Sequence, residues 1–266
     1  MNTLISKLKN SQNLSDPEMA QAIESIMSGG CVTSEIEAFL TFLRDKGEAS
    51  SEIAAAAKVM RRHSSKLPHN YPDLLDTCGT GGDAKNTVNV STIAAIVACA
   101  AGAQVAKHGN RSVSSVCGSA DLLEMLGVKI DLSPAQVAQC LERTGFAFMF
   151  APIFHPSVKH AMAARKNVGG KTIFNLLGPL TNPAGAHYQL LGVYSDRVLM
   201  PVASALLALG LKRAMVVHGS DGMDEITTCG PTRVVMVDEG KIHEKKLDPA
   251  MFRMKTVKHE KSRVCG

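Results

Sequence analysis

Tryptophan is absent from the 266 residues of this sequence, and aromatic residues make up only 4% of it. Hydrophobic residues nevertheless reach 45%, so a core built from this composition must be aliphatic and rich in alanine. Small aliphatic side chains suit helices that pack closely against a sheet. The composition therefore favours an α/β or all-α fold over a β-sandwich.

Long apolar runs and paired cysteines are also missing. No stretch of about 18 apolar residues follows the first ten residues, which themselves carry no apolar run or small-residue cleavage site. The seven cysteines are odd in number, widely spaced and without a CxxC pair, which is typical of reduced thiols. We therefore expect a cytoplasmic protein with no membrane partner.

The basic residues do not form blocks of five or more like charges, although the formal net charge is +5. Scattered lysines and arginines do not require a nucleic-acid partner, and we expect none. A mildly basic surface would suit a small anionic substrate, and it would equally suit a solvated surface without function.

Only helical signals occupy the N-terminal quarter of the chain. Capping boxes at residues 15–18 and 34–37 open the first two of three predicted helices. These two helices should end at Gly29-Gly30 and at Gly47, and the third should run from residue 51 to residue 63.

From Pro72 onward, short apolar runs alternate with helical stretches, which is the pattern of parallel βαβ units. A hairpin turn is predicted at Glu239-Gly240. The predicted strands are residues 73–76, 103–106, 128–130, 147–150, 190–194, 214–217 and 232–237. The predicted helices are residues 89–102, 119–126, 134–144, 156–167 and 197–210. The sequence therefore predicts a small helical domain followed by a larger α/β domain.

The segment Gly79-Thr80-Gly81-Gly82-Asp83 lies between a predicted strand and a predicted helix. Glycines there let successive backbone amides converge on an anion, and the helix N-terminus adds partial positive charge. A glycine-rich turn that only redirects the chain is the alternative. The polar residues that follow favour a phosphate site, and they are Thr87, Asn89, Ser91 and Thr92.

Two more polar segments follow predicted strands at the edge of the sheet where ligands bind in open α/β folds. Lys107 lies in a Lys-His-Gly-Asn-Arg segment and could act as a point charge for phosphate, or the segment could be a solvated loop. Ser119 could cap the next helix or donate to a phosphate oxygen. Asp221, Asp224 and Glu225 indicate Mg²⁺ with oxygen ligands, unless they are simply solvated.

Two segments look more like an acceptor site than a phosphate site. Pro152 and His155 precede a predicted helix that carries Arg165, which could face a substrate carboxylate. The segment at residues 175–183 is rich in turn-forming residues and should not form a plain helix. A purely structural role is the alternative for both.

Six motifs occur in the same order as in a known family, and together they are far more specific than any one of them. The sequence resembles the anthranilate phosphoribosyltransferases of tryptophan biosynthesis. The motifs are DTCGTGGD, NVST, KHGNRSVSS, GSAD, FNLLGPLTNP and HGSDGMDE.

The resemblance implies a homodimer formed through the helical domain, and a site for phosphoribosyl pyrophosphate, anthranilate and two Mg²⁺ ions. The helical domain would comprise residues 1–70 joined by helices from about 155–185, and the α/β domain residues 71–266. Phosphoribosyl pyrophosphate would contact Gly79, Gly82, Asp83, Thr87, Asn89, Ser91, Thr92, Lys107 and Ser119. Anthranilate would contact Gly79, Asn110, Pro152, His155, Arg165 and Gly178, and the metal ligands would be Ser91, Asp224 and Glu225.

The reaction that the resemblance implies is displacement of pyrophosphate from ribose C1 by the anthranilate amine, without a covalent nucleophile. The family continues through further strand and helix segments after the last residues of this sequence. We therefore expect an α/β domain that is incomplete at its C-terminus, either shortened or completed by a partner, and low thermal stability.

Two rival functions are compatible with parts of the pattern. Pyrimidine nucleoside phosphorylases resemble this fold, but a Lys, a Ser and a Thr lead into their glycine loop, where this chain has Thr77-Cys78-Gly79-Thr80. A non-catalytic nucleic-acid-binding relative would suit the basic charge, although it would have little reason to keep Lys107 and the Asp224-Glu225 pair.

Overall fold

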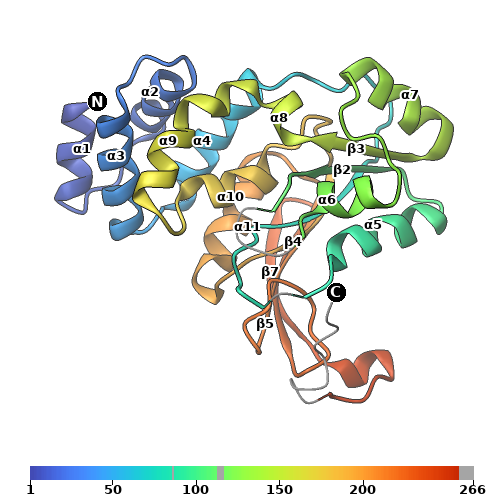
Figure 1. Ribbon diagram of the computed structural model, residues 1–266. Helices are drawn as coiled ribbons and strands as arrows, with labels where there is room; N and C mark the ends of the chain where they lie inside the picture. Colours follow the sequence, from blue (N-terminus) through green and yellow to red (C-terminus); the bar gives the residue numbers. More distant parts are fainter. Residues whose placement is uncertain (86, 113–116, 258–266) are drawn as a thin grey trace.

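A computed structural model describes residues 1–85, 87–112 and 117–257 of the chain. A bundle of helices lies beside a twisted sheet that carries its own helices (Figure 1). Residues 113–116 of the KHGNRSVSS motif and the final segment from residue 258 lie outside the described residues.

Four helices begin the bundle, and the sequence predicted three of them. The helix at the very start was missed because its eight residues carry no cap or glycine stop. The helices are α1 (Asn2–Lys9), α2 (Asp16–Met27), α3 (Thr33–Lys46) and α4 (Ser50–His63).

The capping boxes of α2 and α3 have different outcomes. The first is confirmed, because the backbone N and Oγ of Ser15 donate to the Glu18 carboxylate at 3.0 and 2.9 Å. The second was placed wrongly. The cap of α3 is Val32, whose backbone N donates to Glu35 at 3.2 Å, while Glu37 instead accepts from Asn167 in a distant part of the chain.

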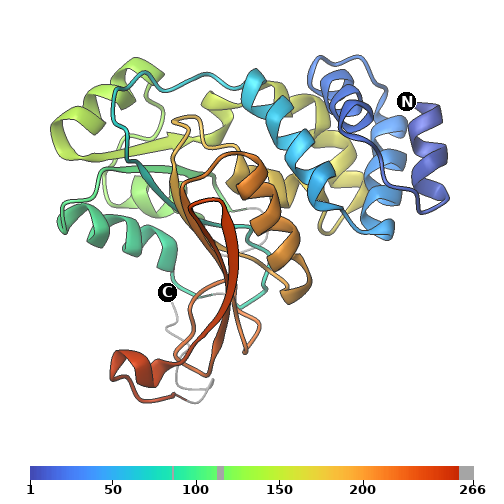
Figure 2. The same ribbon diagram turned by 180° about the vertical axis from the view of Figure 1, so that it is seen from behind.

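Two helices from the middle of the chain return to the bundle. They are α9 (Lys159–Val168) and α10 (Ile173–Leu180), and they follow the short helix α8 (Ala151–Phe154), which packs on the sheet, and the 3₁₀ turn η1 (Pro156–Val158). α9 packs against α2 and α3, and α10 packs against α4 (Figures 1 and 2).

The expectation that residues 175–183 cannot form a plain helix was wrong for most of that segment. The backbone N of Thr172 donates to the Asn175 side chain at 3.0 Å, which caps α10 at its start. Pro179 lies in the last turn, with only Leu180 after it in the helix. A proline in that position disrupts few helical hydrogen bonds, so the helix tolerates it.

Seven strands form one sheet in the order β3-β2-β1-β4-β5-β6-β7. The first five in this order are parallel, and β6 and β7 form an antiparallel hairpin at the edge. This confirms the predicted mainly parallel sheet. The strands are β1 (Leu75–Gly79), β2 (Val105–Gly109), β3 (Phe146–Phe150), β4 (Tyr188–Gly192), β5 (Arg213–Gly219), β6 (Thr232–Asp238) and β7 (Lys241–Leu247).

Six of the predicted strands are found within a few residues of their predicted places. The strand predicted at residues 128–130 is absent, because that segment is a loop after α6 (Ser119–Met125). The predicted hairpin at Glu239-Gly240 is confirmed. Both residues have positive φ angles, 47° and 81°, as a tight turn between antiparallel strands requires.

Helices cover the sheet and link it to the bundle. α11 (Leu199–Ala208), preceded by η2 (Asp196–Val198), packs against β5, β6 and α4 at once (Figure 2). α5 (Val90–Ala100) packs on β1 and β2, and α7 (Pro134–Thr144) packs on β3. The short turn η3 (Pro249–Phe252) follows β7.

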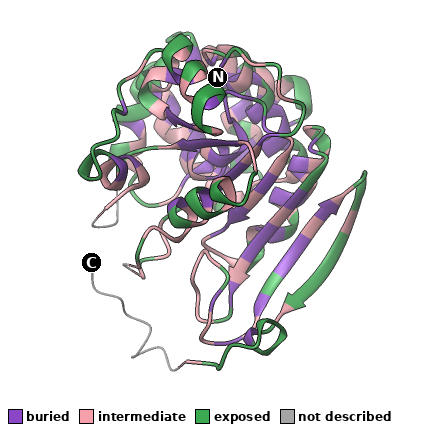
Figure 3. Ribbon diagram, turned by 90° about the vertical axis from the view of Figure 1, so that its right-hand side faces the viewer, coloured by how far each residue is buried: buried purple, intermediate pink, exposed green. Residues whose placement is uncertain are grey.

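One hydrophobic cluster runs without interruption from the bundle into the sheet. It contains Phe39 of α3, Ala56 of α4, Leu206 of α11 and Val216 of β5. The strand β7, by contrast, is largely exposed (Figure 3). None of the helices in the described residues has the length and apolar character needed to cross a bilayer.

Candidate active site at the carboxyl edge of the sheet

The carboxyl ends of the central parallel strands lie side by side. Gly79 at the end of β1 pairs with Gly192 at the end of β4, and Gly192 pairs with Val217 near the end of β5. The glycine loop after β1 and the acidic loop after β5 therefore leave the same edge of the sheet, as the sequence predicted.

The two loops contact each other directly. Asp224 Oδ2 accepts a hydrogen bond from the backbone N of Gly81 at 3.0 Å, and the backbone N of Asp224 donates to Asp83 Oδ2 at 3.4 Å. A Cβ at Gly79 would lie 2.9 Å from Asp224 Oδ2, and one at Gly192 would lie 1.6 Å from the Asp224 carbonyl oxygen. Glycine is therefore required at both strand ends for the acidic loop to pack against them.

Lys107 lies beneath this edge, with only 1% of its surface exposed. Its Nζ donates to the carbonyl oxygen of Thr77 and to Ser91 Oγ, the latter at 3.2 Å. Burial lowers the pKa of Lys107, while the nearby Asp76, Cys78 and Glu225 raise it. Lys107 is thus a buried cation at the base of the site, and the interpretation of this residue as part of a solvated loop was wrong.

The two acids of the predicted metal site are half-buried, and Glu225 accepts a hydrogen bond from the backbone of Ser91. Burial, followed by repulsion from Asp83, raises the pKa of Asp224 to about 7. Burial, followed by repulsion from Asp224, raises the pKa of Glu225 to about 8, although a backbone hydrogen bond from Ser91 lowers it. The structure therefore brings Ser91, Asp224 and Glu225 together near Lys107.

This donor set fits a hard divalent cation. Carboxylate and hydroxyl oxygens are the ligands that Mg²⁺ takes, and a cation would relieve the repulsion between the two half-buried acids. Among the described residues, no group of three or more His, Cys, Asp or Glu side chains is already arranged around a metal position. Ligands from the substrate would then complete such a site, as is common for Mg²⁺.

The third acid of the segment, Asp221, has a structural role instead. Its Oδ2 accepts from Thr227 Oγ1 at 2.6 Å, and its Oδ1 accepts from the backbone N of Met223 at 3.3 Å. Asp221 therefore holds the acidic loop in shape, and its predicted contribution to a metal site finds no support.

Polar groups line the approach to helix α5. Thr77 Oγ1 donates to the Ser91 carbonyl oxygen at 2.7 Å, which ties the helix start to β1. Asn89 Nδ2 donates to the Gly118 carbonyl oxygen at 3.4 Å, whereas Thr92 Oγ1 is buried without a partner in the described structure. Thr87 lies half-buried in the preceding loop.

Ser119 lies at the first turn of α6, but Gly118 occupies the cap position. Asp121 caps that helix by accepting from the backbone N of Gly118 at 2.8 Å. The capping role predicted for Ser119 was therefore wrong. Its Oγ donates to the Asn110 carbonyl oxygen at 3.3 Å and remains beside the backbone of β2, because a Cβ at Gly109 would lie 2.2 Å from it.

A second group of predicted residues surrounds α8 and α10. His155 Nε2 lies 3.0 Å from the Thr181 carbonyl oxygen, and its ring lies 5.0 Å from that of His108, centroid to centroid. Gly178 lies near both, since its backbone forms a hydrogen bond with His108 and its carbonyl oxygen accepts from Thr181 Oγ1 at 3.1 Å. Pro152 is exposed one turn before His155.

Both imidazoles are uncharged at neutral pH. Burial lowers the pKa of His108 to about 3, helped by the neighbouring His155. Burial likewise lowers the pKa of His155 to about 4, although its hydrogen bond to Thr181 raises it. His108 Nε2 is buried and has no hydrogen-bond partner in the described structure.

Arg165 extends from α9 toward α10, where its guanidinium carbon lies 5.2 Å from the centroid of the Phe174 ring. Burial lowers the pKa of Arg165. No carboxylate in the described part of the chain forms an ion pair with it. Arg165 is thus a half-buried cation that could accept a substrate carboxylate, as the sequence suggested.

The sequence analysis gave no role to two buried residues of this region, Asp76 and His108. Asp76 is fully buried, and its carboxylate accepts from the backbone N of His108 at 3.2 Å and from Gln189 Nε2 at 3.4 Å. Asp76 ends a predicted strand, and His108 directly follows Lys107. Both therefore lie beside residues that were assigned from the motifs, and this proximity is the signal that could have identified them.

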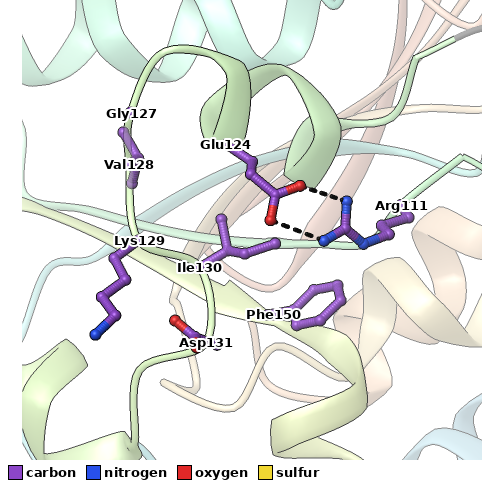
Figure 4. Close-up of a pocket in the computed structure, with 8 residues that line it drawn as sticks. All are labelled: Arg111, Glu124, Gly127, Val128, Lys129, Ile130, Asp131 and Phe150. Atoms are coloured by element: carbon purple, nitrogen blue, oxygen red, sulfur yellow. Dashed lines mark hydrogen bonds and ion pairs between the residues drawn. The ribbon is translucent and has the colours of Figure 1, made fainter.

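A further pocket lies beside α6 and the end of β3 (Figure 4). Its arginine, Arg111, already forms a bidentate ion pair with Glu124 at 2.7 and 3.0 Å. None of the candidate site residues lines this pocket. The residues that do are Arg111, Glu124, Gly127, Val128, Lys129, Ile130, Asp131 and Phe150.

Comparison with known proteins assigns the family. Residues 71–266 match the model of the glycosyl transferase family a/b domain, and residues 2–64 match its helical bundle domain. The anthranilate phosphoribosyltransferase of Moorella thermoacetica is 53% identical over 245 residues, which are 92% of this chain and 72% of that protein. That of Alkalilimnicola ehrlichii is 52% identical over 240 residues, covering 90% and 71%.

Solved structures agree with this assignment over nearly the whole chain. The anthranilate phosphoribosyltransferase of Thermus thermophilus superposes with a TM-score of 0.90 at 43% identity, covering 97% of this chain and 77% of that one. The enzyme from Saccharomyces cerevisiae in complex with PRPP and Mg superposes with a TM-score of 0.87 at 32% identity, covering 98% and 77%. These matches favour the transferase over both rival functions, and the chain belongs to the anthranilate phosphoribosyltransferase family.

Proposed function

We propose that this protein transfers the phosphoribosyl group of phosphoribosyl pyrophosphate to the amine of anthranilate, giving N-(5-phosphoribosyl)anthranilate and pyrophosphate. The observation that carries this proposal is the meeting of the glycine loop, Lys107 and the Asp224-Glu225 pair at one edge of the sheet, in a chain 52–53% identical to enzymes of that name.

The phosphoribosyl pyrophosphate would lie against the glycine loop and the start of α5. The Gly82 and Asp83 amides and the helix start would donate to phosphate oxygens, since the Thr80 and Gly81 amides already donate to Gly192 and Asp224. The unpartnered hydroxyl of Thr92 is a further donor. Lys107 supplies a fixed positive charge from within the sheet, because its buried ammonium is held by a hydrogen bond to Ser91. The complete proposed set is Gly79, Gly82, Asp83, Thr87, Asn89, Ser91, Thr92, Lys107 and Ser119.

Anthranilate would occupy the region between α8, α9 and α10. Its carboxylate pairs with Arg165, a cation that no acid of the described chain neutralises. The neutral rings of His108 and His155 provide an uncharged wall that suits an aromatic ring. Asn110, Pro152 and Gly178 complete the proposed acceptor site.

In the reaction, the amine nitrogen forms a bond to ribose C1 while the bond from C1 to the pyrophosphate oxygen breaks, and the nitrogen loses a proton. The protein lowers the barrier by holding the amine in line with C1 and by placing donors where negative charge develops on the leaving group. Lys107 and the loop amides are such donors. No side chain needs to form a covalent intermediate.

Ser91, Asp224 and Glu225 would hold Mg²⁺, which supplies charge stabilisation for the departing pyrophosphate when it is bound. We propose two ions at this site.

We further propose a homodimer formed through the helical domain, to be tested by analytical ultracentrifugation, and a cytoplasmic location. The free thiols of Cys31, Cys78, Cys99, Cys117 and Cys140 support a reducing compartment.

Loss of anthranilate fluorescence in the presence of phosphoribosyl pyrophosphate and Mg²⁺ tests the function. We expect the signal to fall with enzyme and to stay constant when either phosphoribosyl pyrophosphate or Mg²⁺ is left out. Release of one pyrophosphate for each anthranilate consumed would establish the stoichiometry. A purified, folded chain that consumes no anthranilate would contradict the proposal.

The metal assignment has its own test in Glu225→Ala. Removing one of the two half-buried carboxylates should abolish most activity and raise the Mg²⁺ concentration needed for half-maximal rate. Glu142→Ala is the control, because Glu142 is an exposed acid of α7 and lies outside the loops that form the site. A fully active Glu225→Ala enzyme would refute the assignment.

A further inference from the structure

Lys171, from the part of the chain that belongs to the helical bundle, reaches the glycine loop after β1. It follows Gly169 and Gly170 in the connection between α9 and α10, where both glycines have positive φ angles, 63° and 68°, and are exposed. A Cβ at Gly82 would lie 3.1 Å from Lys171 Cε. The side chain of Lys171 therefore crosses from the bundle to the middle of the proposed phosphate site.

The charge of Lys171 has no acidic partner. None of the ion pairs in the described residues includes it. Its Nζ instead lies 3.9 Å from the centroid of the Tyr194 ring, a cation–π contact. Tyr194 is itself tied to the glycine loop, because its backbone N donates to Thr80 Oγ1 at 3.0 Å.

We propose that Lys171 is a further substrate-binding residue, which contacts the phosphate groups held by the glycine loop. The proposal rests on the proposed function. A lysine is a compact charge on a flexible stem, so its ammonium can leave the Tyr194 ring for a phosphate oxygen through side-chain rotation alone. The ring keeps the cation beside the loop while no anion is there.

This position gives Lys171 a different task from Lys107. Lys107 is buried and reaches the site from within the sheet. Lys171 reaches it from the connection between α9 and α10 of the bundle and is only half-buried. A phosphate bound between the two would link the bundle to the sheet. Lys171 should therefore contribute to the affinity for the phosphate-bearing substrate and not to the affinity for anthranilate.

Lys171→Met tests the proposal, since methionine keeps an unbranched stem that can still lie on the Tyr194 ring. We expect KM for phosphoribosyl pyrophosphate to rise about 10- to 100-fold, as for loss of a charged hydrogen bond, with KM for anthranilate unchanged. Direct titration with Mg²⁺-pyrophosphate should show the same weakening. Lys171→Arg should restore most of the affinity.

Lys166→Met is the matched control, because Lys166 is an exposed lysine of α9 and its replacement removes the same charge. This variant should behave like wild type. Equal pyrophosphate affinity in wild type and Lys171→Met would overturn the inference. A purely structural role for Lys171 would lower the melting temperature and raise both KM values together, which would also overturn it.

Failure of the proposed function gives a different result. If the wild-type chain binds neither phosphoribosyl pyrophosphate nor pyrophosphate with Mg²⁺, the proposed function and the role of Lys171 both fall. If the wild type binds them and Lys171→Met binds them equally well, only the role of Lys171 falls.

Discussion

Lys107 illustrates why a charged residue in a strand carries more information than one in a loop. Its stem occupies space inside the sheet, and its ammonium must be satisfied there by Thr77 and Ser91. An ordinary core position would hold an apolar residue, so a lysine there requires an anionic ligand or partner nearby. Asp76, Glu225 and the proposed substrate provide that balance.

The first prediction concerns Lys107 and Cys78. Lys107→Ala should lower kcat about 10²- to 10³-fold, since it removes a donor to the leaving group. Cys78→Ser should keep much of the activity, because the buried thiol accepts from Gln189 Nε2 at 3.2 Å, and a hydroxyl can accept the same hydrogen bond. Steady-state rates at saturating substrates, with circular dichroism to verify folding, measure both. A Lys107→Ala enzyme with wild-type kcat would remove Lys107 from the mechanism.

The second prediction concerns the pH dependence of stability. The pKa values of His108 and His155 are about 3 and 4 in the folded chain, below the ordinary value of about 6.5. Below pH 6.5 the unfolded chain therefore binds protons that the folded chain does not. The stability that these two histidines contribute is complete above that pH and falls as the pH approaches 4, whereas the raised pKa values of Asp224 and Glu225 act in the opposite direction.

Melting temperatures measured between pH 7.5 and pH 5 test this dependence. His155→Gln should flatten it, while His243→Gln, a change at an exposed residue of β7, should leave the slope unaltered. An unchanged slope in His155→Gln would show that other groups control the acid sensitivity.

Individual site residues were predictable where a motif surrounds them. The glycine loop, Lys107 and the Asp224-Glu225 pair could be assigned because each follows a predicted strand, and parallel strands end at a common edge. Lys171 and Asp76 could not be assigned in this way. Lys171 depends on a contact with Gly82 across 89 positions of sequence, that is 171 minus 82, and no local pattern encodes such a contact.

At the level of elements, the ends of helices were predicted correctly where a side chain caps the backbone or a glycine ends the helix. The box at Ser15 and the glycine stop at Gly47 both hold in the structure. The prediction failed for α10, where packing against α4 stabilises a helix whose sequence is rich in turn formers. It gave no bounds for β7, the strand that the predicted hairpin at Glu239-Gly240 implies, because the charged residues of β7 show no apolar alternation.

The third prediction concerns the end of β4. Gly192→Ala should displace the acidic loop, because the new Cβ would lie 1.6 Å from the Asp224 carbonyl oxygen. We expect a fall in activity of more than about tenfold, in line with the sensitivity of catalysis to small displacements. Gly30→Ala, whose Cβ meets nothing closer than 3.4 Å, is the control. Full activity in Gly192→Ala would show that the loop can move without cost.

At the level of the whole molecule, the boundary near residue 70 stays a prediction, as does the expected low thermal stability. The hydrophobic cluster continues across that boundary, from Phe39 and Ala56 to Leu206 and Val216. Two parts that share one core lose packing together when either unfolds.

The fourth prediction follows from that shared core. Thermal unfolding should occur in one cooperative transition. Tyrosine fluorescence reports the sheet, because Tyr188 lies in β4, Tyr194 follows β4, and Tyr71 packs against a hydrophobic cluster of the sheet. Phe42→Trp would add a fluorescent probe in the bundle. The midpoints of the two signals and of circular dichroism at 222 nm should coincide. Separate midpoints would show that the bundle and the sheet unfold independently.

The exposed strand β7 has a consequence for the behaviour of the chain in concentrated solution. A strand at the edge of a sheet offers unpaired backbone groups to any other edge, and this is a common route to aggregation. Lys241, Lys245 and Lys246 place positive charge along β7. Two copies brought together at β7 would therefore repel each other, so these lysines oppose the formation of β-linked aggregates through this strand.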